Sequence, residues 1–205
     1  MAYNQEQLET LRIVRRYLAS ISRAEMAGLR AQVDQYLRFR RSLEAFLAEH
    51  FNRICTDACF RSRRSACCTR EGIVVYFGDV VVNALESSPA QLEAMERALG
   101  AENQGYKCVF LSSSGCLWQV RPIVCAMFLC DSALKQALEK NPEAAVRWEA
   151  FEARRKDFTW PDKTVLFDEL EKRFIRAGLR SPLMYLNTSP GLLRVKKKAG
   201  ILPDR

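Results

Sequence analysis

The segment Cys55-Thr-Asp-Ala-Cys59-Phe-Arg-Ser-Arg-Arg-Ser-Ala-Cys67-Cys68 carries half of the eight cysteines of this 205-residue chain. The other half lies in residues 108–130, CVFLSSSGCLWQVRPIVCAMFLC, and the chain has no cysteine before residue 55 or after residue 130. The eight positions are Cys55, Cys59, Cys67, Cys68, Cys108, Cys116, Cys125 and Cys130. Their confinement to one window indicates a shared role, so we take them as the centre around which the chain folds.

The redox compartment decides how such a set is interpreted. No apolar run approaches the roughly 20 residues that span a bilayer, and the N-terminus lacks the basic and apolar regions of a secretory signal. We therefore expect a cytoplasmic protein without a membrane segment, in which thiols stay reduced and cysteines indicate metal binding before disulfides. Buried packing, above all for Cys125 and Cys130 among apolar neighbours, and disulfide formation remain as alternatives for single cysteines.

Histidine is almost absent, because His50 is the only one in the chain. Sites that need two imidazoles are excluded, so a bound metal must be held mainly by thiolates, which select zinc or an iron–sulfur cluster. The cysteine spacing matches neither paired C-x2-C knuckles nor the bacterial ferredoxin pattern. Eight thiols suffice for two four-thiolate sites or for one polynuclear site.

The adjacent cysteines Cys67 and Cys68 restrict how the eight thiols can be shared among metal ions. Neighbouring side chains point to opposite faces of an extended chain and diverge by roughly 100° in a helix. The two thiols are thus poorly placed to bind one ion together. We expect them to serve two neighbouring sites, or two metal atoms of one cluster.

Apolar periodicity predicts helices in most of the remaining chain. Residues 4–50 show a helical pattern with a break and a cap at Ser20 and Ser22, which indicates a helical hairpin or one kinked helix. The arginines of this part lie largely off the apolar stripe, so a solvated helix face is expected. Further helices are predicted at 80–85 with Asp79 as cap, after Ser88-Pro89, after Arg121 with Pro122 in the first turn, and at 131–140, 142–158 and 162–178, the last two begun by Pro142 and Pro161 and the third ended by Gly178.

Short strands are predicted at residues 72–77, and as a hairpin of 108–111 with 116–120 joined by Ser112–Gly115. The tail from Ser181 reads as irregular. The predicted class is mainly α (α+β), with a small cysteine-ligated centre flanked by an N-terminal helical hairpin and C-terminal helices. We divide the single domain, 1–205, into a helical part (1–54), a cysteine-cluster metal-binding core (55–130), and C-terminal helices with a basic tail (131–205).

The cysteine pattern resembles a known family. Cys55, Cys59 and Cys67-Cys68, followed by Cys108-Val-Phe-Leu, Gly115-Cys-Leu-Trp and Arg121-Pro-x-x-Cys125, are similar to the YkgJ-type cysteine-cluster family, described as a zinc- or iron-chelating domain. The resemblance covers about residues 55–130 and implies the seven cysteines through Cys125 as metal ligands, with Cys130 as the eighth. Many relatives have a tighter first group, whereas seven residues separate Cys59 from Cys67 here, so the resemblance leaves open which cysteines share a metal.

Several non-cysteine residues of the window are candidates for supporting roles. A four-thiolate zinc site or a four-cysteine [4Fe–4S] cluster carries a charge of about −2. Arg121 could offset it and hydrogen-bond a sulfur, or instead pair with a surface carboxylate. Trp118 and Phe128 fit core packing or the exclusion of water from a cluster. Asp57 and Asp79 are candidate oxygen ligands, although a helix cap accounts better for Asp79.

The sequence supports a metal-binding protein that holds zinc or an iron–sulfur cluster, [4Fe–4S] if the metal is iron, and meets a protein partner through its flanking helices. The alternative is an iron–sulfur redox protein or protein-modifying enzyme. No glycine-rich phosphate loop or Gly-x-Ser-x-Gly occurs, so the sequence assigns no catalytic residue, and it assigns no oligomeric state.

Nucleic-acid binding ranks last, although the chain has a formal charge of +8. Residues 55–130 contain seven basic and seven acidic residues, so the whole excess lies in the flanks. Thiolate metal sites would make the window negative. The basic balance is therefore better explained as basic helices and a basic tail around an anionic centre.

Overall fold

The computed structural model describes residues 2–69, 74–102 and 105–202. It is 69% helical, and the described residues contain only one two-stranded antiparallel sheet, which confirms the mainly α (α+β) class. The elements are α1 (Ala2–Ser20), α2 (Arg23–Phe51), the π-helix η1 (Asn52–Phe60), α3 (Phe77–Glu86), α4 (Pro89–Gly100), β1 (Leu111–Ser112), β2 (Gly115–Cys116), α5 (Ile123–Met127), α6 (Asp131–Leu138), α7 (Pro142–Thr159), α8 (Leu166–Arg176), α9 (Tyr185–Thr188) and α10 (Pro190–Lys198).

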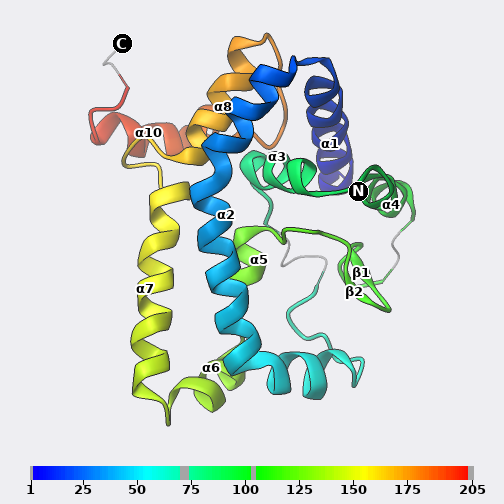
Figure 1. Ribbon diagram of the computed structural model, residues 1–205, viewed down its shortest axis with the longest axis vertical. Coiled ribbons are helices and arrows are strands. Elements are labelled where there is room, and N and C mark those ends of the chain that lie inside the picture. Colours follow the sequence, from blue (N-terminus) through cyan, green and yellow to red (C-terminus); the bar gives the residue numbers. More distant parts are fainter. Residues whose placement is uncertain (1, 70–73, 103–104, 203–205) are drawn as a thin grey trace.

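The predicted break in the N-terminal part is confirmed at Ser22. Its side chain accepts a hydrogen bond from the Glu25 backbone N–H at 3.2 Å, and its own N–H donates to the Glu25 carboxylate at 2.9 Å. This capping box ends one helix and begins the next. The two helices then go to different neighbours, since α1 packs on α3 and α4 while α2 packs on η1, α6 and α7 (Figure 1). The predicted helical hairpin of α1 and α2 is therefore an open one, in which each helix packs on other elements.

An aromatic core joins α2 to α7 and α8. The Tyr36 ring contacts Phe158 and Phe167 edge-on, with ring centroids 5.1 and 5.3 Å apart, and all three side chains are buried. Further along, Phe46 stacks on Trp148 at 6.1 Å. Edge-to-face and offset contacts of this kind add to the burial of apolar area. They hold α2 and α7 side by side (Figure 1) and so fix the end of α2 from which η1 continues.

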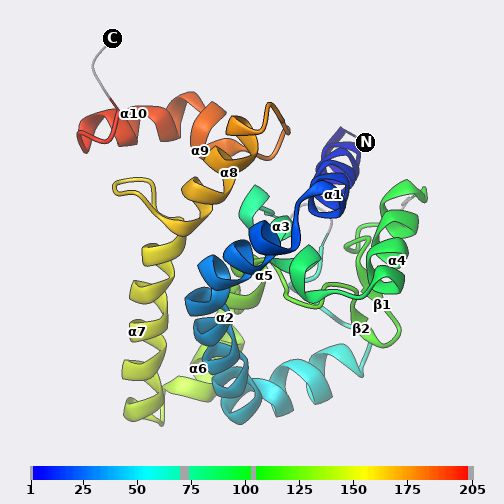
Figure 2. The same ribbon diagram turned by 45° about the horizontal axis from the view of Figure 1, so that its top comes forward.

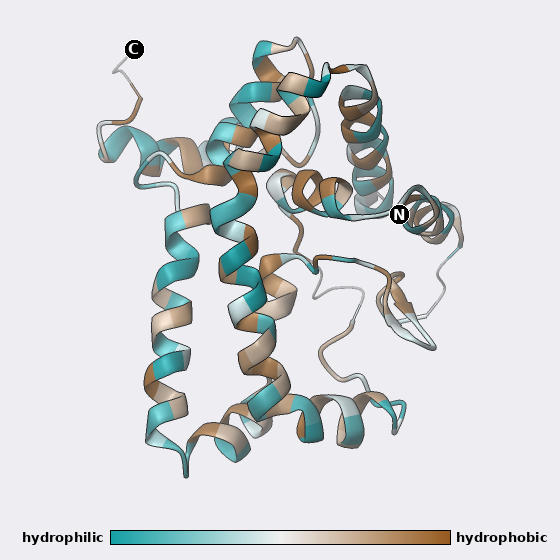
Figure 3. Ribbon diagram, viewed as in Figure 1, coloured by the Kyte–Doolittle hydropathy of each residue, from teal (hydrophilic) through white to brown (hydrophobic). Residues whose placement is uncertain are grey.

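The strand predicted at 72–77 is wrong where it can be compared, because residues 74–76 are neither strand nor helix and α3 begins at Phe77; residues 72–73 lie outside the described part. The β-branched residues of α3 are buried against neighbouring helices, and the helix is coloured as largely hydrophobic in Figure 3. Tertiary burial therefore decides against local β propensity. Gly78 permits the close approach of α8, since an added Cβ would lie 2.5 Å from Cγ of Phe167.

The other predicted boundaries hold in part. Ser88 caps α4 and Asn141 caps α7, which begins at Pro142 as expected. The hairpin exists but is short, with Leu111 paired to Cys116 and Ser112 to Gly115. The third C-terminal helix begins at Leu166 and not at Pro161.

The tail is helical, contrary to the expectation of an irregular segment, and α10 lies beside α8 and α9 (Figure 2). Its Lys196 is fully buried and forms an ion pair with the fully buried Asp168 of α8. Asn187 donates to Asp168 at 3.2 Å and to Glu171 at 2.7 Å, which ties α9 to the same network. A buried ion pair thus anchors the C-terminal helix, with Lys172 as a second cation 2.7 Å from the other carboxylate oxygen of Asp168.

Within the residues that the structure describes, no helix combines the length and apolarity needed to cross a bilayer.

Candidate metal centre

The π-helix η1 presents the first two cysteines. It continues α2 without interruption, and Arg61 N–H donates to the Thr56 carbonyl at 2.9 Å, the i→i+5 bond of a π-helix. Cys55 and Cys59 are four residues apart on this element and are half-buried. Short π-helical stretches inserted at the end of an α-helix often accompany functional sites.

A tight turn after η1 brings the chain back to the next two cysteines. Arg63 and Ser65 have positive φ angles of 61° and 39°, unusual for residues with a Cβ. The Arg64 and Ser65 N–H groups donate to the Cys59 carbonyl at 3.0 and 3.2 Å. Lys107 Nζ donates to the carbonyls of Arg64 and Ser65, the latter at 3.0 Å, so this lysine holds the strained turn in place.

The hairpin and the segment before it carry Cys108 and Cys116. Cys108 N–H donates to the Cys68 carbonyl at 3.1 Å, and Thr69 pairs with Lys107 in an antiparallel bridge. Cys116 ends β2, which begins at Gly115, where φ is +121°. The backbone thus joins the first cysteine segment to the second directly at Cys68 and Cys108.

The last two cysteines lie on short helical elements. Cys125 is on α5 and Cys130 is the residue before α6, which packs on η1. The buried Asp79 accepts hydrogen bonds from the N–H groups of Tyr76 and Ile123, both at 3.0 Å, and so fixes the start of α5 against α3. Burial raises the pKa of the Asp79 carboxyl to about 6, which these hydrogen bonds partly oppose.

We group the eight thiols by the neighbours that influence Cys55 and Cys68. We call Cys55, Cys59, Cys67 and Cys130 the first thiol set: the pKa of Cys55 is raised by burial and then by the other three thiols. We call Cys68, Cys108, Cys116 and Cys125 the second thiol set. After its contact with Cys67 and its burial, Cys68 is influenced by the other three members of that set.

Cys67 and Cys68 connect the two sets. A hydrogen bond between their thiols raises the pKa of Cys67 and lowers that of Cys68, and burial adds to the first effect and opposes the second. Each of the two is otherwise grouped with a different set of partners. Cys67 acts on Cys55, whereas Cys68 is influenced by Cys108, Cys116 and Cys125.

Backbone N–H groups face several of the sulfurs. Ala66 N–H donates to Cys59 Sγ at 3.4 Å. Burial raises the pKa of Cys108 to about 11, against which the N–H groups of Phe110 and Leu111 act to lower it. Trp118 does the same for Cys116, and Val74 for Cys125. Such donors stabilise a thiolate more than a thiol, and thiolate is the form that binds metal.

The cysteine side chains do not form a closed metal-binding geometry in this structure. Within the described ranges, no group of three or more Cys, His, Asp or Glu side chains has the geometry to hold a metal ion. His50 does not join either set; its ring packs on Phe46 at a centroid distance of 4.6 Å. In donor type alone, thiols with N–H donors and an arginine nearby are the groups with which proteins hold a thiolate-bound metal.

That arginine is Arg121, and the structure shows the second of the two roles considered from the sequence, a pair with a carboxylate at the surface. Its Nη2 donates to the two carboxylate oxygens of Glu44 at 3.1 and 3.0 Å. Its positive charge also acts to lower the pKa of Cys55 and Cys67 in the first set, and of Cys116 and Cys125 in the second. Arg121 thus lies where it can offset negative charge on both.

The other candidate residues have simpler roles. Trp118 is buried and packs edge-on against Phe110 at 5.4 Å, in agreement with core packing. Phe128 is 58% exposed, so neither core packing nor the shielding of a cluster describes it. Asp57 is exposed and pairs with Arg61 at 2.9 Å. Asp79 accepts hydrogen bonds from two backbone N–H groups, which does not suit an oxygen ligand. The prediction that it precedes the helix as its cap is wrong, because α3 already begins at Phe77 and Asp79 lies in its first turn, where it accepts from the N–H of Tyr76.

Two supporting residues were not anticipated. Arg40 of α2 is 3% exposed, and its Nη1 donates to the Arg121 carbonyl at 2.7 Å and to the Tyr36 hydroxyl at 3.1 Å. Lys107 holds the turn before Cys67. An arginine in line with the apolar positions Tyr36, Leu43 and Leu47 was the available signal for Arg40, whereas nothing in the sequence marks Lys107.

Comparisons of the chain with models of known families, with curated proteins and with solved structures give no match.

Proposed function

We propose that this protein binds metal through its eight cysteines, as two neighbouring four-thiolate centres formed by the first and the second thiol set. The observation that carries the proposal is the division of Cys67 and Cys68 between the two sets. The N–H donors that face the sulfurs and the shared counter-charge of Arg121 support it. The resemblance to the YkgJ-type family points to the same residues.

Zinc and [4Fe–4S] are the two occupants that four thiolates accept in this setting. A closed zinc centre would supply structural stability, whereas a [4Fe–4S] cluster would supply one-electron chemistry. In either case binding draws the sulfurs of each set together and releases their protons. The strained turn at residues 61–66 lies between members of the first set and would move with them.

We further propose that the flanking helices meet a partner protein, which would use the exposed Val146 of α7 and Trp160 directly after it. Nucleic acid is a weaker candidate, because the buried Lys196 removes one charge from the basic tail.

The test is anaerobic purification followed by metal analysis, acid-labile sulfide determination and an absorption spectrum. We expect either about two zinc ions per chain and no colour, or iron with sulfide and a broad visible absorption. Sulfide and colour would turn attention to an iron–sulfur redox protein or enzyme. A protein that retains neither zinc nor iron after purification and reconstitution would contradict metal binding.

The division into two centres is tested with Cys67→Ser and Cys68→Ser, and Ala66→Ser serves as the exposed neighbouring control. Each cysteine variant should lose about half of the metal, and the loss should come from different centres. The double variant should then lose nearly all of it, and the control none. Complete loss from either single variant would show one shared cluster.

A further inference from the structure

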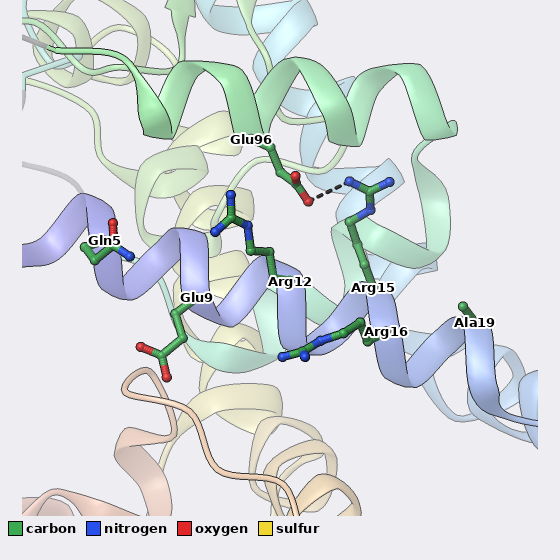
Figure 4. A pocket seen from close by; sticks show the side chains of 7 residues that line it. All are labelled: Gln5, Glu9, Arg12, Arg15, Arg16, Ala19 and Glu96. Carbon is green, nitrogen blue, oxygen red and sulfur yellow. Dashed lines mark hydrogen bonds and ion pairs between the residues drawn. The ribbon is translucent and has the colours of Figure 1, made fainter.

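Five polar side chains meet where α8, α9 and α10 pack together, and none of them belongs to either thiol set (Figure 2). They are Asp168, Glu171 and Lys172 of α8, Asn187 of α9 and Lys196 of α10. Burial distinguishes the pair of Asp168 and Lys196 from ion pairs at the surface. Both of its side chains are 0% exposed, whereas those of Arg15 and Glu96, which pair between α1 and α4 (Figure 4), are 29% and 24% exposed.

The amine of Lys196 lies beside a side-chain amide. Its Nζ contacts Oδ1 of Asp168 and donates to Oδ1 of Asn187 at 3.4 Å. The carbonyl carbon Cγ of Asn187 is one bond away from that oxygen. Once a proton has passed from Nζ to Asp168, the neutral amine is a nucleophile toward this carbon.

Asp168 contacts both the nucleophile and the group that would leave. The same Oδ1 that meets Lys196 accepts a hydrogen bond from Nδ2 of Asn187 at 3.2 Å. Lys172 lies 2.7 Å from the other oxygen, Oδ2, and so leaves Oδ1 to the amine and the amide. One carboxylate oxygen can therefore take a proton from Nζ and pass it to Nδ2.

Glu171 holds the amide from a second direction. Its Oε2 accepts from Nδ2 of Asn187 at 2.7 Å, and its Oε1 accepts from the Leu186 N–H at 3.2 Å. Burial raises the pKa of Glu171 to about 7, so part of the molecules carry no charge there at neutral pH. Two lysine ammonium groups then face the single carboxylate of Asp168, and a reaction that consumes one of them leaves a balanced pair.

We propose that Lys196 and Asn187 become joined by an isopeptide bond that forms after folding, with the ion pair of Lys196 and Asp168 as its starting state. Nζ attacks Cγ of Asn187, the Nζ–Cγ bond forms and the Cγ–Nδ2 bond breaks. Nζ loses two protons, one before and one after the attack, and Nδ2 gains both through Asp168 and leaves as ammonium. A lysine ammonium and a carboxamide thus give a secondary amide and an ammonium ion, without an oxidant or a cofactor. The fold supplies the proximity that separate amines and amides lack in water.

Mass spectrometry of the intact full-length chain, denatured after several days at neutral pH, tests the proposal. We expect a mass lower than the sequence mass by one ammonia. Trypsin cuts after Arg194, between the two joined positions, and does not cut after an acylated lysine. A digest should therefore contain a branched peptide in which residues 181–194 are joined to residues 195–197.

Two matched variants assign the reacting group. Lys196→Arg keeps a positive charge opposite Asp168 but has no amine, so its chain should keep the full mass of its sequence. Lys198→Arg, the same change at an exposed position of α10, should lose one ammonia as the unchanged protein does. Circular dichroism checks that each variant is folded, and the branched peptide of the unchanged protein decides if Lys196→Arg is not.

Two results overturn the proposal. The first is a folded, unchanged chain that keeps its full mass. The second is a loss of ammonia that persists in Lys196→Arg, which would come from cyclisation of an asparagine. Neither result bears on metal binding, because the thiols take no part in the reaction.

Discussion

Replacement of Lys196 by methionine is predicted to destabilise the protein strongly, although this residue belongs to a basic tail that looks dispensable. Its ammonium group is fully buried and is paired with Asp168, which is also fully buried. Methionine retains the apolar stem of the lysine but leaves the carboxylate with one cation fewer. The variant therefore probes the charge and not the packing.

The magnitude follows from what remains around Asp168. Breaking a buried ion pair by removing one partner costs about 3–5 kcal/mol. Lys172 still contacts the other oxygen of Asp168 at 2.7 Å and is itself partly exposed, and Asn187 still donates to it. We therefore expect the lower end, about 3 kcal/mol, which corresponds to a fall in Tm of roughly 6–12 °C for a chain of this size.

Urea unfolding, monitored by far-ultraviolet circular dichroism, measures the difference in the free energy of unfolding between Lys196→Met and the unchanged protein. The metal content of each preparation is checked to be equal. Lys198→Met, at an exposed position of the same helix, should stay within about 0.5 kcal/mol of the unchanged protein. The double variant Asp168→Asn/Lys196→Met should recover a large part of the loss, since position 168 then carries no buried charge. The reasoning fails if Lys196→Met and Lys198→Met have the same free energy of unfolding. It also fails if the loss in the double variant equals the sum of the losses of Asp168→Asn and Lys196→Met.

Three other changes have defined outcomes. Burial raises the pKa of Glu171 from 4.5 to about 7, so the folded state favours its protonated form, and up to about 3 kcal/mol of stability present below pH 4.5 is lost as the pH rises to about 7. The buried Asp79, whose pKa is raised to about 6, adds a fall of the same sign. Glu171→Gln should therefore reduce the fall in the free energy of unfolding, measured with urea, between pH 4.5 and 7 without abolishing it, and an unchanged pH dependence would contradict this. Gly78→Ala should destabilise the protein by about 1–3 kcal/mol, measured by thermal unfolding, because the added Cβ clashes with Phe167. The control Gly28→Ala has open space around it and should be neutral or stabilising in the same measurement. Arg121→Gln should weaken metal binding about 10–100-fold in a chelator competition; unchanged affinity would show that the Glu44 ion pair is its whole role.

Local signals in the sequence were sufficient for the helix boundaries that depend on a few neighbouring residues. Ser22 with Glu25, and Ser88 with Pro89 and Gln91, identify caps because the hydrogen bonds involved span only three residues. The break between α1 and α2 could be predicted for this reason. Their packing on different partners could not, since both helices carry ordinary apolar stripes.

The predictions of secondary structure were wrong in segments whose conformation depends on contacts with residues far away in the sequence. Residues 74–76 and the start of α3 have β-forming composition, but Val81 and Val82 are buried in a helix that packs on α8. The tail becomes helical because Lys196 meets a carboxylate 28 residues earlier in the chain. For the candidate site, the sequence predicts one centre that contains all eight cysteines, with different partners for the adjacent pair. The division into sets required the fold, because it depends on how η1, the hairpin and α5 meet.

Because of the π-helix η1, the positions of the cysteines depend on the number of residues between Asn52 and Phe60 as well as on their types. Each residue of an α-helix turns the side chains by about 100°. Deletion of a single residue between Asn52 and Phe60 would let α2 continue as an ordinary α-helix, with Cys59 and the turn after it rotated away from Cys67. A lineage can therefore exchange the exposed residues of this segment freely, while one codon gained or lost there would separate the cysteines as effectively as their replacement.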